Sequence, residues 1–246
     1  KEMQAASLGA TQDNFSVEKM LKFKFIVPDL ATQKRIADVL SAYDDLIENN
    51  NRRIELLEKA AQDLYKEWFV RFRFPGHETA KFQNGLPEGW EVKRLLDVLI
   101  VKYGKDHKSI PNGDIPILGS GGVMRYGNRS LYEKESVLIP RKGSLNNVMY
   151  MNEPFWTVDT MFYTEPQMPF AVKYLFYVLS QIDMQLLNAG AALPSMTTDI
   201  LYHLKIIFPS ANLLKIFDNK IEHSFKQIKR LQTISKNLKK QRDLLL

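Results

Sequence analysis

Two long heptad runs, separated by a mixed insert, constrain this chain more than any other feature of its sequence. The first run extends from Ile36 to Trp68, and its apolar positions alternate steps of four and three residues without a Gly or Pro between them. This spacing predicts a helix packed lengthwise against a second helix. At 1.5 Å per residue the run would extend about 50 Å. Because its apolar seam is narrow, such a helix needs a partner to bury it.

The second run supplies that partner within the same chain. It extends from Phe217 to Leu245 with the same alternation, and Phe217 lies 181 positions after Ile36 (217 − 36). The offset continues upstream, where Gly190-Ala191 repeats Gly9-Ala10. Internal repeats set the architecture of a chain, so we interpret this one as repeat, insert, repeat. One helix enters the insert and the other leaves it, so we expect the two helices to pack antiparallel.

The seam residues are expected to face the partner helix. They are Ile36, Leu40, Ile47, Ile54, Leu57 and Leu64 in the first helix, and Ile221, Ile228, Leu231 and Leu238 in the second. Asn50 is a polar position in the first seam, a common device for fixing helix register. A seam of this kind more usually marks an oligomerisation helix, and that interpretation stays open.

The insert reads as a compact mixed domain. Short apolar runs predict strands at 115–118, 137–140, 148–151 and 160–163, with turn clusters between them. Residues 169–185 predict a helix that begins with Pro169. The predicted fold class is therefore α+β, with a globular domain attached to a long antiparallel two-helix coiled coil. The predicted boundaries are 1–32 for the tail of a preceding domain, 33–70 for the first helix, 71–89 for a linker, 90–210 for the domain and 211–246 for the second helix.

Composition excludes several classes of protein. The chain has no Cys, which excludes disulfides, thiol catalysis and Cys-ligated zinc and fits a cytoplasmic location. Its four His residues are scattered, so we expect no metal site. It has no apolar stretch long enough for a membrane span, so we expect no membrane partner. The start, Lys1-Glu2-Met3-Gln4, lacks an initiator Met and does not resemble a signal peptide, so we expect a fragment or a processed chain.

No motif in the chain predicts catalysis. Asn152-Glu153-Pro154-Phe155 differs from the Asn-Pro-Pro-Phe box of amino-methyltransferases at its second position, and a glycine-rich cofactor loop is missing from the sequence. Gly119-Ser120-Gly121-Gly122 is not followed by the Gly-Lys-Ser/Thr of a nucleotide-binding loop, which favours a flexible turn. We therefore expect no catalytic residues and no cofactor in this chain.

The insert does carry basic and amide side chains in predicted turns. Arg pairs with guanine, Asn with adenine, and Lys, Ser and backbone amides hold phosphates. The candidate DNA-binding residues are Lys105, Lys108, Arg125, Tyr126, Arg129, Arg141, Lys142, Ser144, Asn146 and Asn147. Each group of neighbouring residues in this list is, by itself, more often a solvated loop. Taken together, the groups favour a DNA-binding surface.

The net charge of +6 comes mainly from the last helix, where residues 212–246 carry nine basic and three acidic residues, whereas residues 86–189 carry eleven of each. A basic helix face suits phosphates, solvent or an acidic partner alike, so the charge alone does not predict DNA binding.

Several segments resemble the specificity (S) subunit of type I restriction–modification systems. They are Ile26-Val27-Pro28 with Gln33-Lys34 before the first helix, Leu86-Pro87-Glu88-Gly89-Trp90-Glu91-Val92, the segment 137–144, and Phe155-Trp156-Thr157-Val158-Asp159-Thr160. Together with the duplicated helices, the resemblance covers nearly the whole chain. It departs from the family by lacking most of a first recognition domain.

The resemblance implies a non-catalytic subunit that recognises DNA. Its target-recognition domain would read one half of a bipartite site in double-stranded DNA, and its helices would act as a spacer and dock methyltransferase (modification) subunits. S-adenosylmethionine, ATP and Mg would belong to the modification subunits and a restriction subunit. As a half-subunit, the chain would also pair with a second copy of itself. The alternative is a coiled-coil scaffold or oligomerisation protein without sequence-specific DNA binding.

Overall fold

A computed structural model describes residues 21, 24, 26–188 and 194–245. Most of the predicted tail at 1–32 lies outside the described residues. The described chain divides into two compact units, one formed by residues up to Asn50 together with Ile234 onward, and one running from Asn51 to Thr233. Each of the two long helices contributes to both units.

The first long helix, α3, begins at Leu30 and ends at Tyr65, where a π-helical turn, Lys66–Val70, extends it. It begins before the predicted boundary because Asp29 caps it: the carboxylate of Asp29 accepts hydrogen bonds from the backbone N–H of Thr32 at 2.9 Å and from its hydroxyl at 2.8 Å. These bonds lower the pKa of Asp29. The second long helix, α6, covers Ala211–Asp243 and has Lys240 and Arg242 in its last turn.

In the first unit, the end of α6 meets the middle of α3. Arg242 Nη1 lies 2.5 Å from Asp44 Oδ1, which fixes the antiparallel register there. Ile47 is buried, and so are the polar residues Asn50 and Ser235. Ile36 departs from the predicted seam, because its side chain is 48% exposed. It lies about two helical turns before Asp44, and α6 ends one residue after Arg242, so α6 does not extend far enough to cover it.

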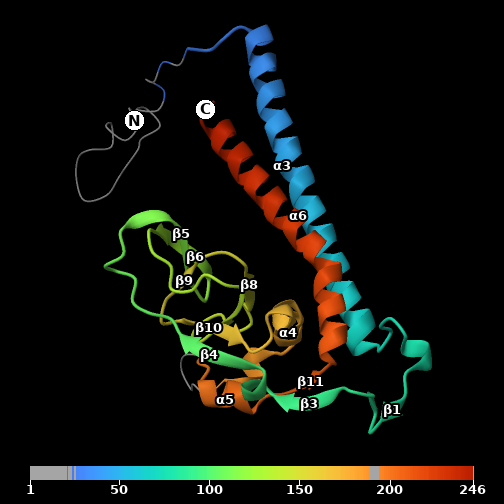
Figure 1. The fold of residues 1–246 in the computed structure, drawn as a ribbon. Helices are drawn as coiled ribbons and strands as arrows, with labels where there is room; N and C mark the ends of the chain where they lie inside the picture. The colour runs from blue at the N-terminus through green and yellow to red at the C-terminus, as the bar shows by residue number, and fades with distance from the viewer. Residues whose placement is uncertain (1–20, 22–23, 25, 189–193, 246) are drawn as a thin grey trace. The chain divides into compact units, whose positions relative to one another are not determined.

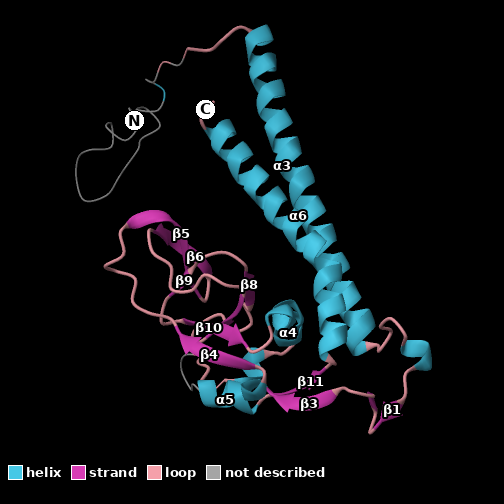
Figure 2. Ribbon diagram, viewed as in Figure 1, coloured by secondary structure: helices cyan, strands magenta, loops and turns pink. Residues whose placement is uncertain are grey.

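In the second unit, the end of α3 meets the start of α6. The rings of Trp68 and Phe217 lie 5.7 Å apart. Ile221 and Leu231 are buried, whereas Ile54, Leu57, Leu64 and Ile228 are half-buried. The predicted fold class is confirmed: an α+β domain is carried by a long antiparallel helix pair (Figures 1 and 2).

The domain is built from short strands around two main sheets. The strands are β1 (Phe82–Gln83), β2 (Leu86–Pro87), β3 (Glu91–Arg94), β4 (Leu99–Tyr103), β5 (Asn112–Gly119), β6 (Gly122–Gly127), β7 (Ser136–Pro140), β8 (Met149–Met151), β9 (Trp156–Thr157), β10 (Met161–Pro166) and β11 (Lys205–Phe208). One sheet has the order β4-β10-β7-β8 and is antiparallel throughout. The other has the order β6-β5-β9, with β9 parallel to β5. Strands β3 and β11 pair antiparallel, so the two ends of the domain meet.

Two short helices complete the domain. The predicted helix at 169–185 is divided into a 3-10 turn at Pro169–Ala171, α4 at Val172–Ser180 and a second 3-10 turn at Met184–Leu187. Helix α5 covers Thr198–His203, and the hydroxyl of Thr197 accepts a hydrogen bond from the N–H of Ile200 at 3.3 Å. A further 3-10 turn at Leu95–Asp97 follows β3, and another at His77–Thr79 precedes β1.

The main core lies where the helix pair joins the domain. Phe69, in the π-helical turn, packs edge-on against Tyr174 of α4 and Phe217 of α6, with ring centroids 4.8 Å apart in both pairs. Trp90 of the Gly-Trp motif packs 5.8 Å from Phe69 and 5.4 Å from Phe74. The turn before Trp90 needs the positive φ of Gly89, +81°. The motif therefore has a structural role, because it closes the aromatic core.

A buried cation also joins α4 to α6. The side chain of Lys173 is 2% exposed, and its Nζ lies 2.7 Å from Asp218, 2.9 Å from Glu222 and 3.4 Å from Glu135. Tyr150 donates its hydroxyl to Glu135 at 2.8 Å. Burial opposes the charge of Lys173, but the hydrogen bonds to Asp218 and Glu222 raise its pKa. Among the described residues of the domain, Lys173 is the one Lys that is fully buried. Its ion pairs direct the ammonium group toward helix α6.

Replacing Lys173 with Met should lower the free energy of unfolding by roughly 3 kcal/mol, because it leaves three carboxylates without their buried cation. Chemical denaturation measures the effect. The matched control is Lys226→Met, which removes a 72% exposed partner of Glu222 and should change stability by less than about 0.5 kcal/mol. Because the pKa of Lys173 is raised in the folded chain, its contribution to the free energy of unfolding is fully present below the pKa of Lys in the unfolded chain. That contribution is lost as the pH rises through the pKa of Lys173 in the folded chain. Equal effects of the two substitutions would contradict this role.

Replacing Ser235 with Ala should stabilise the first unit. Its hydroxyl is buried and has no hydrogen-bond partner among the described residues, and such a group costs about 1 kcal/mol or more. The melting temperature should rise by more than it does for Asn237→Ala, an exposed position on the same helix that controls for helix propensity. A gain no larger than that of the control would show that the hydroxyl of Ser235 is already satisfied.

Candidate nucleic-acid interface

The ten residues predicted to contact DNA all lie in the second unit. They occupy the loop between β4 and β5 (Lys105, Lys108), strand β6 (Arg125, Tyr126), the segment after β6 (Arg129) and the segment after β7 (Arg141, Lys142, Ser144, Asn146, Asn147). The prediction that Arg125 and Tyr126 lie in a turn is wrong. They belong to β6 because Ile117 and Pro116 of β5 pair with them. Contact of any of the ten with DNA remains a prediction.

Arg125 is directed into the domain and binds the loop that precedes β5. Its Nη2 donates to the carbonyl of Ile110 at 3.0 Å and to the carbonyl of His107, and its Nε donates to His107 Nδ1 at 3.2 Å. These acceptors lie 15 and 18 positions earlier in the sequence. The guanidinium therefore holds a loop in place, and much of its donor capacity is used within the protein.

Arg141 and Lys142 gather around Asp159 and Tyr103. Arg141 Nη1 donates to the carbonyl of Asp159 at 3.1 Å, and its guanidinium carbon lies 5.3 Å from the centre of the Tyr103 ring. Lys142 Nζ lies 3.5 Å from the carboxylate of Asp159. The ring of Tyr103 is 52% exposed, so Arg141 and Tyr103 form an accessible cation–π pair. Tyr103 was not among the residues predicted from the sequence, because it lies 38 positions before Arg141 (141 − 103), at the end of β4, whereas Arg141 follows β7.

The two predicted Asn residues stabilise loops. Asn146 Nδ2 donates to Asp183 Oδ1 at 3.0 Å, while Asn147 Nδ2 donates to the carbonyl of Ser120 at 2.8 Å. Asn147 thus joins the segment after β7 to the β5–β6 turn. Each amide has a partner in the protein, so reading a base would need the remaining donors and acceptors.

The loop between β4 and β5 presents two unpaired cations on a fixed backbone. Its entry at Gly104 lies so close to β9 that a Cβ there would lie 2.0 Å from the carbonyl oxygen of Val158. Lys105 N–H donates to the carbonyl of Thr157 at 2.8 Å, and Trp156 Nε1 donates to the carbonyl of Lys105 at 2.9 Å. Within the described chain, neither ammonium group of Lys105 and Lys108 has an ion-pair partner.

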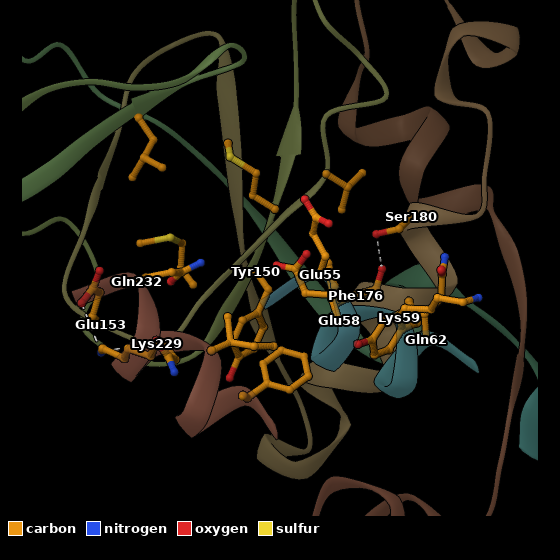
Figure 3. Close-up of a pocket in the computed structure, with 18 of the residues that line it drawn as sticks. Glu55, Glu58, Lys59, Gln62, Tyr150, Glu153, Phe176, Ser180, Lys229 and Gln232 are labelled. Carbon is orange, nitrogen blue, oxygen red and sulfur yellow. Dashed lines mark hydrogen bonds and ion pairs between the residues drawn. The ribbon is translucent and has the colours of Figure 1, made fainter. Parts of the chain in front are cut away.

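A groove of about 850 Å³ lies elsewhere in the same unit, lined by α3, β8, α4 and α6 (Figure 3). Its walls include Tyr150, Phe176 and Phe225. Its rim carries three acidic residues (Glu55, Glu58, Glu153) and two basic ones (Lys59, Lys229). Lys229 is paired with Glu153 at 3.1 Å, and burial together with nearby Glu55 raises the pKa of Glu58. The acidic excess does not favour phosphate, so the groove is distinct from the basic loop surface.

The described residues show neither a metal centre nor a membrane span. Among them, no group of three or more His, Cys, Asp or Glu side chains is placed to hold a metal ion. Within the same residues, no helix is both long enough and apolar enough to cross a bilayer.

Comparison with known proteins places the chain in a family. The sequence profile described as "Type I restriction modification DNA specificity domain" matches residues 1–59 and 87–242. The chain belongs to this family. It is 28% identical to the type I restriction enzyme MjaIX specificity subunit of Methanocaldococcus jannaschii, over 97% of this chain and 62% of that protein. It is 27% identical to the MjaVIII specificity subunit of the same organism, over 87% of this chain and 60% of that protein.

A solved structure supports the fold of this family member. The S subunit of a type I restriction–modification system from M. genitalium superimposes with a TM-score of 0.67 at 21% sequence identity, covering 98% of this chain and 67% of that one. The chain spans about three fifths of the length of the two M. jannaschii relatives.

Replacing Gly104 with Ala should distort the β4–β5 loop, because the new Cβ would meet backbone atoms of Val158 that cannot rotate away. The expected loss in the free energy of unfolding is about 2 kcal/mol, measured by chemical denaturation. Gly121→Ala is the control, since nothing lies within 4 Å of the position of its Cβ. If Gly104→Ala is as stable as the control, the close approach of the loop to β9 does not constrain it.

Proposed function

We propose that this chain is the non-catalytic DNA-recognition part of a type I restriction–modification complex. Membership of the specificity-domain family carries the proposal, and the named specificity subunits among its relatives support it. The basic β4–β5 loop and the accessible Arg141–Tyr103 pair supply chemistry suited to phosphates and bases. The recognition domain would read one half of a bipartite site in double-stranded DNA.

The helix pair would act as the spacer of the complex. Helix α3 has 36 residues and α6 has 33, which corresponds to about 50 Å of length. That length is equivalent to about 15 base pairs at 3.4 Å rise, enough to separate two half-sites by roughly one helical turn. The same helices would dock the modification subunits. A second copy of the chain would supply the other half-site if the chain works as a half-subunit.

The chemistry would reside in partner subunits. S-adenosylmethionine would bind to the modification subunits, and ATP and Mg would serve a restriction subunit. The complex would act in the cytoplasm, where it meets the DNA that it modifies. A coiled-coil scaffold without DNA recognition gains no support from the family assignment.

Exchanging residues 90–190 for the equivalent segment of another specificity subunit tests the proposal. In cells that also express the modification subunits, the chimera should methylate a different half-site while the spacing between the half-sites stays unchanged, because the helices are kept. Sequencing of methylated genomic DNA measures both. A chimera that restores the melting behaviour of the parent chain but keeps its target would place recognition outside residues 90–190. A pure scaffold would leave methylation unchanged in cells with and without the chain.

A further inference from the structure

His107 lies between the two exposed lysines of the β4–β5 loop, and its ring is held in one orientation. The loop backbone is fixed on both sides, by Lys105 N–H bonded to the carbonyl of Thr157 and by Ile110 N–H bonded to the carbonyl of His107 at 3.1 Å. Asp106 uses its carboxylate to accept the N–H of Lys108 at 3.2 Å, which closes a local turn. The ring of His107 is therefore presented by a rigid loop.

The contact with Arg125 determines which ring nitrogen carries the proton. A guanidinium group only donates hydrogen bonds. Since Arg125 Nε lies 3.2 Å from His107 Nδ1, Nδ1 must be the acceptor, and the proton of the neutral ring must be on Nε2. Arg125 thus selects the tautomer in which Nε2 carries the proton and acts as a hydrogen-bond donor.

That donor has no acceptor within the described part of the protein. The hydrogen bonds of the His107 side chain there consist of the one from Arg125, and the residue is half-buried, so its Nε2 is not enclosed in the core. Lys105 and Lys108 on either side are exposed and have no ion-pair partner among the described residues. A fixed hydrogen-bond donor between two free cations is complementary to a group that combines negative charge with hydrogen-bond acceptors.

We infer that His107 binds DNA directly, donating from Nε2 to an acceptor on the duplex, and that Arg125 is its positioning residue. The inference rests on the proposed function of the chain. It reassigns Arg125, predicted from the sequence to contact DNA, to a role inside the protein. The flanking lysines favour a phosphate oxygen as the acceptor. Guanine N7 or O6 offers the same acceptor chemistry from a base edge.

Two substitutions of His107 distinguish a direct contact with DNA from a purely structural role of this residue. In His107→Asn the amide oxygen takes the place of Nδ1 and still accepts from Arg125, but the outward donor is lost. In His107→Gln the side-chain amide reaches the place of Nε2 and keeps that donor. The full chain carrying either change is titrated with a pool of random-sequence duplex DNA over a range of salt concentrations. His203→Asn, an exposed His of α5 whose side chain is 70% exposed, is the matched control.

The expected result is a loss of affinity of roughly tenfold or more for His107→Asn, with His107→Gln within about threefold of the parent chain and His203→Asn unchanged. The slope of affinity against salt should stay constant in the two His107 variants, because both keep Lys105 and Lys108, whereas Lys105→Ala should reduce the slope by about 0.9. Equal weakening on all sequences assigns the acceptor to a phosphate, and a lost preference at one base pair assigns it to a base. Both support the contact.

Three results would overturn the inference. One is unchanged binding by His107→Asn. Another is equal weakening by the Asn and Gln variants with a matching fall in melting temperature, which would make His107 a structural residue only. The third comes from ¹⁵N chemical shifts of the imidazole: an Nε2 without a proton in the parent chain excludes the proposed donor. In Arg125→Gln, His107 should no longer favour the tautomer with its proton on Nε2, and the affinity for DNA should fall. If the parent chain shows no salt-dependent binding at all, the proposed function itself fails.

Discussion

The packing around Phe69 holds the helix pair and the α+β domain together in the second unit. Besides its helix neighbours Tyr65 and Trp68, its ring packs against three more distant rings: Trp90 before β3, Tyr174 in α4, and Phe217 near the start of α6. Trp68 and Phe69, neighbours in the π-helical turn, are both buried in this core.

Basic side chains fall into two groups, and only the structure separates them. Arg125, Arg141, Lys142 and Lys229 have partners in the folded chain, so much of their charge serves internal contacts. Lys105 and Lys108 lie on a fixed backbone and have no such partners among the residues that the structure describes. The difference matters for binding, because an ammonium that must leave an internal partner gains less from a phosphate than one that is free. Sequence clusters of charge therefore overstate the binding surface.

Long-period features were predictable from the sequence, and contacts between distant segments were not. The heptad runs fixed both helices, since thirty residues of one periodicity leave few alternatives. Apolar runs located the cores of β5, β7, β8 and β10. The charged strand β3 and the glycine-flanked strand β6 were missed, because pairing with β11 and β5, and not their own composition, makes them strands. His107 was visible within its basic cluster, but its significance depends on Arg125, 18 residues away.

The buried Lys173 limits which domains could replace the α+β domain of this chain. It belongs to the domain, whereas two of its carboxylate partners, Asp218 and Glu222, belong to α6. If a replacement domain had an apolar residue at this position, Asp218 and Glu222 would be partly buried without this cation to pair with. The hybrid protein would then be less stable, whichever DNA sequence its domain binds. A domain exchanged into this chain must therefore supply a cation that matches Asp218 and Glu222 of α6.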